Sequence, residues 1–195
     1  MKHVLSVSIG SSKRNHKVEM EILGEDFLIE RVGTDGDIKR AIHIIEEKDG
    51  KVSAFGMGGI DLYLCINNKR YTIKDALTIA RAAKISPIVD GSGLKNTLER
   101  KVIDYLISQE IIDFKNKKVL LVSGMDRFGM AESLEKTGCD LVLGDLIFAL
   151  GVPIPLKSLK SLNVVASILA PIVCKLPFRL IYPTGEKQEE IGRAS

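Results

Sequence analysis

Three short segments near the N-terminus alternate between apolar and polar residues, a pattern typical of strands with one buried face. They are His3–Ile9, Lys17–Leu23 and Phe27–Val32, and the turn-forming stretches GSSKRN and GED separate them. Short turns of this kind join neighbouring strands that run in opposite directions. The sequence therefore predicts a three-strand antiparallel meander at the start of the chain.

Helical and strand patterns alternate from residue 33 onward. The predicted helices follow the apolar series Ile38, Ala41, Ile42 and Ile45; then Leu77, Ile79, Ala80 and Ala83, after the capping-box spacing of Thr72 and Asp75; then Leu94, Leu98, Val102 and Leu106. The predicted strands are Val52–Phe55, Ile85–Val89 and Val119–Ser123. This alternation favours parallel strands with right-handed crossovers. The predicted fold class is α/β, with the meander followed by Rossmann-like β/α units and a mostly parallel sheet.

Two lobes are expected, because the polar link DFKNKK interrupts the pattern. Residues 1–112 form the predicted N-terminal α/β lobe with the meander, and residues 113–195 form a Rossmann-like C-terminal lobe. The pattern at the C-terminus predicts a strand at Phe178–Tyr182 and then the charged tail EKQEEIGRAS. That tail has the composition of a helix start without an apolar face, which favours either a truncated C-terminal lobe of a longer protein or a frayed end. An apolar groove or unpaired strand edge near residues 178–195 would support truncation.

Composition and charge indicate which partners and which cellular compartment to expect for the protein. The formal net charge is only +3, from 28 basic and 25 acidic residues that are scattered, so no nucleic-acid partner is predicted. The longest apolar run, Val164–Cys174, is shorter than the roughly 20 residues of a membrane span, and we expect a buried helix interrupted by Pro171. Three separated cysteines and a start without a signal-peptide pattern favour the cytoplasm. A homo-oligomer is compatible with these features.

Polar loops follow the predicted strands, where ligands bind in open parallel sheets. Asp35, Asp61, Asp90, Asp126 and Asp145 all fall in these loops. Aspartate and glycine in such loops also cap helices and form turns, so each residue alone has a structural explanation. Five such loops at one predicted sheet edge favour a shared small-molecule site.

The stretch KVLLVSGMDRFGMAESLEKTGCDLVLGD, residues 118–145, partly matches a dinucleotide-binding fingerprint. A strand precedes Gly124 and Gly129, and Asp145 follows Gly124 by 21 residues, near the spacing of a ribose-binding acid. The middle glycine of the fingerprint is missing, and Asp126 would repel a phosphate unless Arg127 offset its charge. The hypothesis places Gly124, Arg127 and Gly129 at the phosphates and Asp145 at the ribose of NAD or NADP. GMGG at residues 56–59 also follows a predicted strand and is a competing candidate for the nucleotide-binding turn.

Few residues suit catalysis. No pair of histidines has metal-ligand spacing, so no metal site is predicted. Lys95 and Asp90 flank the GSG turn and form the best candidate pair for proton transfer, because a lysine above a helix N-terminus can have a lowered pKa. A helix cap with a solvated lysine is the alternative explanation.

The segments VSIGSSKRNHKVE, RVGTDGDI, AFGMGGIDLYL, IVDGSGLKNTLER and VLLVSGMDRFGMAESL together resemble a bacterial family, found mainly in clostridia and their relatives, that is labelled quinate 5-dehydrogenase. The resemblance covers essentially the whole chain and implies NAD(P)-dependent oxidation of an alicyclic polyol. Lys95, Asn96 and Thr97 loosely resemble the substrate loop of quinate and shikimate dehydrogenases. SGMDRFG departs from the cofactor turn of those enzymes.

Three functional hypotheses follow. The first is a nucleotide-binding Rossmann-like protein that acts as an NAD(P)-dependent dehydrogenase on quinate, shikimate or a similar polyol. The second is an ATP-dependent phosphotransferase or nucleotide-binding module of the actin and sugar-kinase type, because GSSKR in the first turn resembles the phosphate loop of that lobe. The third is a non-catalytic regulatory domain.

Overall fold

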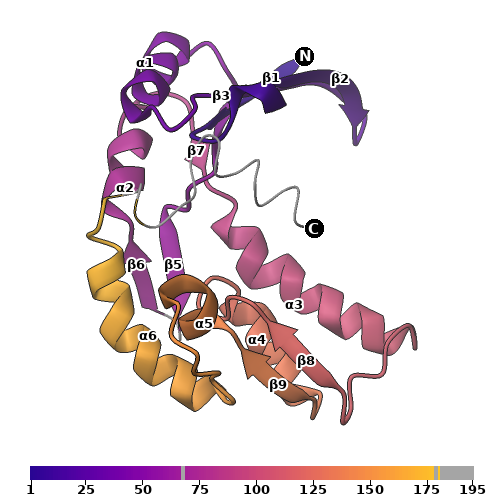
Figure 1. Cartoon of the computed structure of the whole chain (residues 1–195). Helices are drawn as coiled ribbons and strands as arrows, with labels where there is room; N and C mark the ends of the chain where they lie inside the picture. Colours follow the sequence, from indigo (N-terminus) through magenta and orange to yellow (C-terminus); the bar gives the residue numbers. More distant parts are fainter. Residues whose placement is uncertain (67–68, 178–179, 181–195) are drawn as a thin grey trace. The chain divides into compact units, whose positions relative to one another are not determined.

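The computed structural model describes residues 1–66, 69–177 and 180, and the chain divides into two compact units (Figure 1). The N-terminal unit contains residues 1–62 and 72–91 together with the described residues from 175 onward. The C-terminal unit contains residues 63–71 and 92–174. The chain therefore enters the C-terminal unit twice, first for a hairpin and again at residue 92.

A five-stranded sheet with the order β2-β3-β1-β4-β7 forms the N-terminal unit. Its strands are β1 (Lys2–Ser8), β2 (His16–Ile22), β3 (Glu25–Gly33), β4 (Ala54–Gly58) and β7 (Ile88–Val89). β1 pairs in parallel with β3 and β4, and β4 with β7, whereas β2 pairs with β3 in the antiparallel direction. The first three strands thus alternate in direction along the chain, and β3 lies between the other two. The predicted α/β fold class, with an N-terminal strand unit and a mostly parallel sheet, is confirmed.

Buried apolar side chains hold this sheet together with its helices. Helices α1 (Ile38–Lys48) and α2 (Lys74–Ala80) belong to the N-terminal unit, and the one-turn 3-10 helix η1 (Ser12–Arg14) follows β1. Leu5 and Phe55 of adjacent strands are at most 2% exposed, and Ile45 of α1 is fully buried. The periodicity of α1 therefore predicted its buried face correctly. The side chain of Asp37 caps the start of α1 by accepting the N–H of Arg40.

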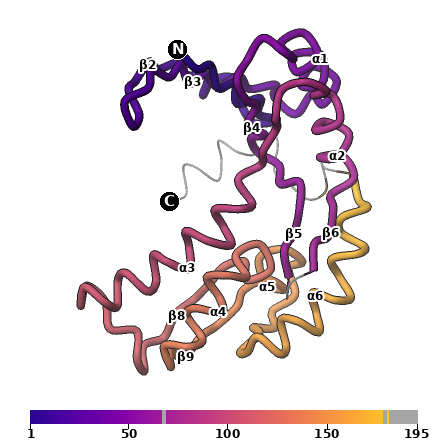
Figure 2. Tube along the Cα trace, turned by 180° about the vertical axis from the view of Figure 1, so that it is seen from behind, coloured from indigo at the N-terminus to yellow at the C-terminus, as the bar shows by residue number. Residues whose placement is uncertain are grey.

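Two strands, four helices and a hairpin build the described part of the C-terminal unit. Its elements are β5 (Tyr63–Ile66) and β6 (Lys69–Thr72, whose last residue belongs to the N-terminal unit), α3 (Ser92–Ser108), β8 (Lys118–Leu121), α4 (Phe128–Lys136), β9 (Asp140–Leu143), the short α5 (Asp145–Leu150) and α6 (Leu159–Val173). β8 and β9 pair in parallel, and α4 connects them along the chain. Figures 1 and 2 both show α6 beside the β5–β6 hairpin. Phe128, Leu143 and Leu162 belong to the buried core of this unit.

Several local predictions differ from the structure. The sequence did not predict β5 and β6, because KRYT is mostly polar. Thr72 ends β6 instead of capping α2, whose N-cap Ile73 makes no side-chain cap bond. β7 contains only two of the five residues predicted for its strand. The predicted strand at Phe178–Tyr182 and the tail lie, Leu180 apart, outside the described residues, as does the test for truncation based on them.

The largest differences concern α3. The sequence placed this helix in a lobe ending at residue 112, whereas its packing against α4 groups it with the C-terminal unit. Its predicted apolar face is also turned outward, because Leu94, Leu98 and Val102 are 60%, 51% and 41% exposed. Ile103, on another side of the helix, is buried instead. Periodicity reveals an apolar stripe but does not decide which side of a helix packs.

Asp49, directly after α1, provides a pH-dependent contribution to stability. Its carboxylate accepts the backbone N–H groups of Lys84, Ile85 and Ser86 at 2.6, 3.0 and 2.7 Å. The bond from Ser86 is the main cause that holds the pKa of Asp49 below its ordinary value of 3.8. A carboxyl group with a depressed folded-state pKa stabilises the fold above its unfolded pKa, and this stabilisation is lost as the pH falls through the folded value.

We therefore expect Asp49→Asn to lower the free energy of unfolding at neutral pH, with a difference from wild type that shrinks as the pH falls below about 4. Urea denaturation over a series of pH values measures this difference. Asp104→Asn, at an exposed position of α3, is the control. An effect of Asp49→Asn that does not change with pH would contradict the assignment.

Candidate functional site

Asp145, the expected ribose-binding acid, is buried and holds a backbone turn. It is 5% exposed, and its two carboxylate oxygens accept the N–H groups of Gly124 at 2.9 Å and Met125 at 2.8 Å. A Cβ atom at Gly124 would lie 3.0 Å from side-chain atoms of Leu143 and Leu162. The turn after β8 is thus packed against the core and tied to the end of β9. In this arrangement Gly124 and Asp145 offer no open cradle to a dinucleotide.

Arg127 and Gly129, the other predicted cofactor residues, lie where α4 meets α3. The Arg127 guanidinium forms an ion pair with Glu99 of α3. A Cβ atom at Gly129 would lie 2.9 Å from the Arg100 Nε atom, so the missing side chain allows the two helices to approach closely. Both residues therefore fasten α3 to α4.

The proposed proton-transfer residues, Lys95 and Asp90, belong to different units. The Lys95 ammonium group donates a 2.7 Å hydrogen bond to Asp126, so the carboxylate that seemed a liability for phosphate binding forms an ion pair. Asp90 accepts the backbone N–H of Leu62 at 2.6 Å. Of the five loop aspartates, Asp35, Asp61 and Asp90 lie in the N-terminal unit, and Asp126 and Asp145 lie in the other. GMGG and SGMDRFG are likewise in different units.

A cleft of about 350 Å³ opens within the C-terminal unit. The hairpin, α3 and α4 form its walls, and the lining residues are Tyr63, Cys65, Lys69, Arg70, Ser92, Gly93, Asn96, Thr97, Arg100, Phe128 and Glu132. The residues from α3 recur at helical spacing on one side of that helix. This side is opposite the exposed apolar stripe of α3. Asn96 and Thr97, which resemble part of a substrate loop, thus line the cleft.

Cationic groups outnumber anionic ones in this cleft. Lys69, Arg70 and Arg100 contribute three positive charges, and Glu132 contributes one negative charge. The Arg70 guanidinium lies 5.6 Å from the centre of the Tyr63 ring, within the range of a cation–π contact. Arg100 forms an ion pair with Glu132 and donates a hydrogen bond to the Asn96 side chain at 3.1 Å. Such a set of groups suits a ligand that carries a carboxylate or phosphate together with hydroxyl groups.

A smaller recess adjoins the cleft, and Lys95 and Asp126 are among the residues that line this recess. The recess shares Tyr63, Cys65 and Phe128 with the cleft, among other lining residues. Glu99, which pairs with Arg127, is near Lys95: burial raises the pKa of its carboxyl group, while the positive charges of Arg127 and Lys95 act in the opposite direction. Its Oε2 atom is buried and has no hydrogen-bond partner within the described part of the chain. The arrangement therefore places an amine and acids where protons could be exchanged with a bound ligand.

Sequence reasoning missed the hairpin half of this cleft. Lys69 and Arg70 are on β6, a strand without apolar alternation. The motif YLCINNKRYT does contain a signal, because two asparagines separate two short β-prone runs, as in a hairpin turn.

In residues 1–66, 69–177 and 180, no group of three or more histidine, cysteine, aspartate or glutamate side chains is placed to hold a metal ion. No helix in that same portion is long and apolar enough to span a membrane.

Asp145→Asn tests the structural role of the buried carboxylate. An asparagine side chain has one acceptor oxygen and no charge, so at least one of the two charge-assisted bonds to the turn is lost. We expect the free energy of unfolding to fall by about 1.5–3 kcal/mol, and amide hydrogen exchange at Gly124 and Met125 to accelerate. The matched control is Asp140→Asn, at an exposed position of β9. Unchanged exchange at both amides would contradict this role.

Comparisons with known proteins place a boundary in the chain near residue 92. One family model, a domain of unknown function (DUF8753), matches residues 3–90, and a second, a domain of unknown function (DUF8754), matches residues 93–195. The break between the matches coincides with the second entry of the chain into the C-terminal unit, at residue 92. A comparison with curated proteins found no match. Because the second model covers more than half of the 195 residues, the chain belongs to the DUF8754 family.

Proposed function

We propose that the C-terminal unit binds a small hydroxylated anion in its cleft, and that the protein is an oxidoreductase acting on an alicyclic hydroxy acid such as quinate or shikimate. The observation that carries the proposal is the convergence of Lys69, Arg70 and Arg100 on one cleft that hydroxyl and amide side chains also line. The cleft volume of about 350 Å³ is at the lower end of the range for ligand sites and suits a molecule of this size.

Each part of such a ligand has a matching group in the cleft. A carboxylate fits the guanidinium of Arg70 or the ammonium of Lys69, because charged hydrogen bonds are stronger than neutral ones. Ring hydroxyl groups fit Ser92, Asn96 and Thr97, which can donate or accept hydrogen bonds. The ring of Phe128 supplies an apolar wall.

The proton-transfer part of the proposal assigns Lys95 to the substrate hydroxyl. Lys95 lines the recess beside the cleft and is held by Asp126. A lysine in this position can accept a proton only when it is neutral, so the ion pair with Asp126 opposes that role until the ligand changes its surroundings. Asp90, the other predicted catalytic residue, belongs to the N-terminal unit and has no role in the proposed proton transfer.

NAD or NADP is the cofactor that this activity would require, and it would accept the hydride from the substrate carbon. Gly124 and Asp145 do not fit a dinucleotide as they stand, because their hydrogen-bonding groups are already joined to each other. Both dinucleotides are therefore part of the binding test below.

A second candidate, ATP binding by the N-terminal unit, is favoured by one observation. After β1 the chain continues to β2 on one side of the sheet, and after β4 it next rejoins this sheet at β7 on the other side. The turns after β1 and β4 therefore lie where ligands bind in open parallel sheets. These turns touch, since the N–H of Ile9 donates to the carbonyl of Gly58 at 3.0 Å. Lys13 and Arg14 are the basic residues of the GSSKR turn, which follows β1 at this candidate site.

Ligand-induced stabilisation distinguishes these proposals. We expect quinate or shikimate to raise the melting temperature of the wild-type protein, and the double variant Lys69→Ala/Arg70→Ala to weaken binding at least tenfold, because charge-assisted hydrogen bonds are lost. The control is Lys39→Ala/Arg81→Ala, which removes two exposed cations of the N-terminal unit and should leave binding unchanged. Calorimetric titration measures the affinities.

The remaining ligands of the panel separate the alternatives. Stabilisation by NAD or NADP together with a hydroxy acid would support the oxidoreductase activity. Stabilisation by ATP with magnesium that is lost in Lys13→Ala/Arg14→Ala would favour the phosphotransferase type. If no ligand changes the melting temperature, the cleft proposal fails and a regulatory role gains support.

A further inference from the structure

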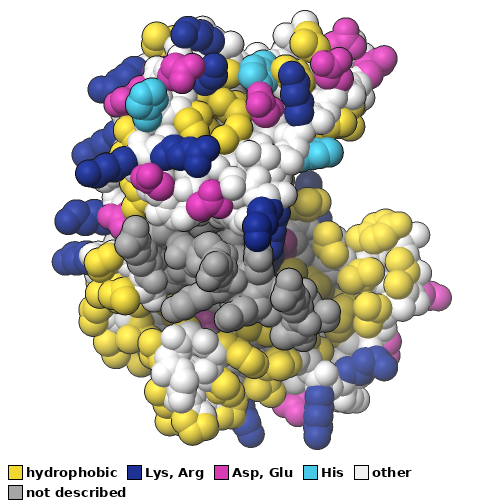
Figure 3. Space-filling model, turned by 45° about the horizontal axis from the view of Figure 1, so that its top comes forward, with side chains coloured by type: hydrophobic (Ala, Val, Ile, Leu, Met, Phe, Trp, Pro, Cys, Tyr) yellow, Lys and Arg dark blue, Asp and Glu magenta, His cyan; other side chains and the backbone are white. Residues whose placement is uncertain are grey.

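The three cations that line the cleft differ in whether an acid neutralises them. Arg100, on the helical wall formed by α3 and α4, forms an ion pair with Glu132. Lys69 and Arg70, on the hairpin wall formed by β5 and β6, have no ion pair with an acid among the residues that the structure describes. On the face shown in Figure 3, basic and acidic side chains are interspersed. The unbalanced positive charge of the cleft is thus a local feature of its hairpin wall.

Arg100 is held by two neighbours on the helical wall. Its Nε atom donates to the backbone carbonyl of Asn96 at 3.0 Å, and its Nη2 atom donates to Oδ1 of the same residue at 3.1 Å. The Nη2 group also pairs with the Glu132 carboxylate, and the two side chains are only 29% and 31% exposed. The Nη1 group remains for a ligand hydroxyl, but the charge of the guanidinium is already offset.

Glu132 is the one acid that lines the cleft within the described portion of the chain. A carboxylate or phosphate bound at the helical wall would meet the Glu132 carboxylate and compete with it for Arg100. Like charges repel more strongly in a partly desolvated site than in water. A ligand with anionic groups at both ends meets this repulsion in either orientation, because one group contacts the hairpin wall and the other then faces Glu132.

We infer that Glu132 is a specificity-determining residue that restricts the cleft to ligands with a single anionic group. The inference rests on the proposed function, because it concerns the same cleft, and it narrows the substrate class to hydroxy acids with one carboxylate. That carboxylate binds the hairpin wall, and the uncharged hydroxyl end lies against Asn96 and Thr97, beside the recess that Lys95 lines. Dicarboxylic acids and phosphorylated hydroxy acids are the compounds that Glu132 excludes.

Shikimate and shikimate phosphorylated at one ring hydroxyl are matched probes, because they share the ring and the carboxylate. In calorimetric titration of the full chain, we expect the wild type to bind shikimate at least tenfold more tightly than the phosphorylated probe. Glu132→Gln keeps the shape of the side chain and an acceptor for Arg100 but removes the charge. It should strengthen binding of the phosphorylated probe roughly tenfold, the size of one charge-assisted hydrogen bond, and change the affinity for shikimate much less.

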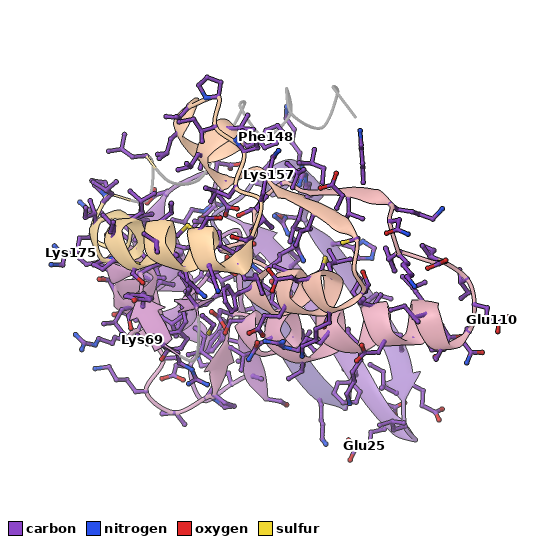
Figure 4. The ribbon with its side chains drawn as sticks, turned by 90° about the horizontal axis from the view of Figure 1, so that it is seen from below. Glu25, Lys69, Glu110, Phe148, Lys157 and Lys175 are labelled. Carbon is purple, nitrogen blue, oxygen red and sulfur yellow. The ribbon has the colours of Figure 1, made fainter. Side chains whose placement is uncertain are left out.

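Two further variants separate specificity from a purely structural role. Glu132→Asp keeps the negative charge and should retain the preference for shikimate. Glu110→Gln makes the same chemical change as Glu132→Gln at an exposed position of the same unit, and it should leave both affinities unchanged. Figure 4 shows the labelled Glu110 beyond the C-terminal end of α3, away from Lys69 of the hairpin. Circular dichroism checks that each variant remains folded.

The outcomes distinguish this inference from the proposed function. Equal affinity of the wild type for the two probes, or a parallel change of both affinities in Glu132→Gln, would overturn the role of Glu132 and leave the proposed ligand-binding cleft in place. Binding of neither probe by the wild type would instead contradict the proposed function, and the inference with it.

Discussion

The packing of α3 against α4 is the contact on which the cleft of the C-terminal unit depends. Two features permit it: Gly129 has no side chain where Arg100 passes, and ion pairs join the two elements at Lys95–Asp126, Glu99–Arg127 and Arg100–Glu132. Partly buried ion pairs contribute less to stability than to geometry, because desolvation offsets much of their attraction. Their main consequence here is the orientation of α3, which directs one side to the cleft and the apolar stripe outward.

This packing changes the meaning of the stretch that resembles a dinucleotide fingerprint. Its glycines and charged residues serve contacts within the unit: Gly124 and Asp145 close a turn, Gly129 admits α3, and Arg127 pairs with Glu99. The strand, helix and strand of the motif are present, but its polar groups are hydrogen-bonded or ion-paired to other residues of the same unit. The groups that face open space come from a different part of the chain, the β5–β6 hairpin and the first turns of α3.

The sequence predicted where helices and strands lie along the chain better than it predicted which of them are neighbours in space. Alternation located β1, β2 and β3, and spacing located α1 and α3, because these patterns reflect burial along one element. Strand order is a long-range property, so the position of β3 between β2 and β1 was not accessible from the sequence. The spacing of Gly124 and Asp145 predicted a shared dinucleotide site, whereas in the structure the Asp145 carboxylate accepts the backbone N–H of Gly124. The sequence prediction missed Lys69 and Arg70, because exposed charged residues on a short strand resemble those of any polar turn.

The cleft, the fingerprint turn and the GSSKR turn use different residues, so variants can separate them. The central claim remains that the cleft, and not the fingerprint turn or the GSSKR turn, receives the ligand.

Chemical-shift mapping of a ¹⁵N-labelled protein during titration with quinate or shikimate tests that claim most directly. The account predicts that the amide signals of Gly93, Asn96 and Thr97 shift in proportion to ligand saturation, while those of Ser11–Arg14 remain in place. Shifts confined to Ser11–Arg14, or no shifts with either acid, would contradict it.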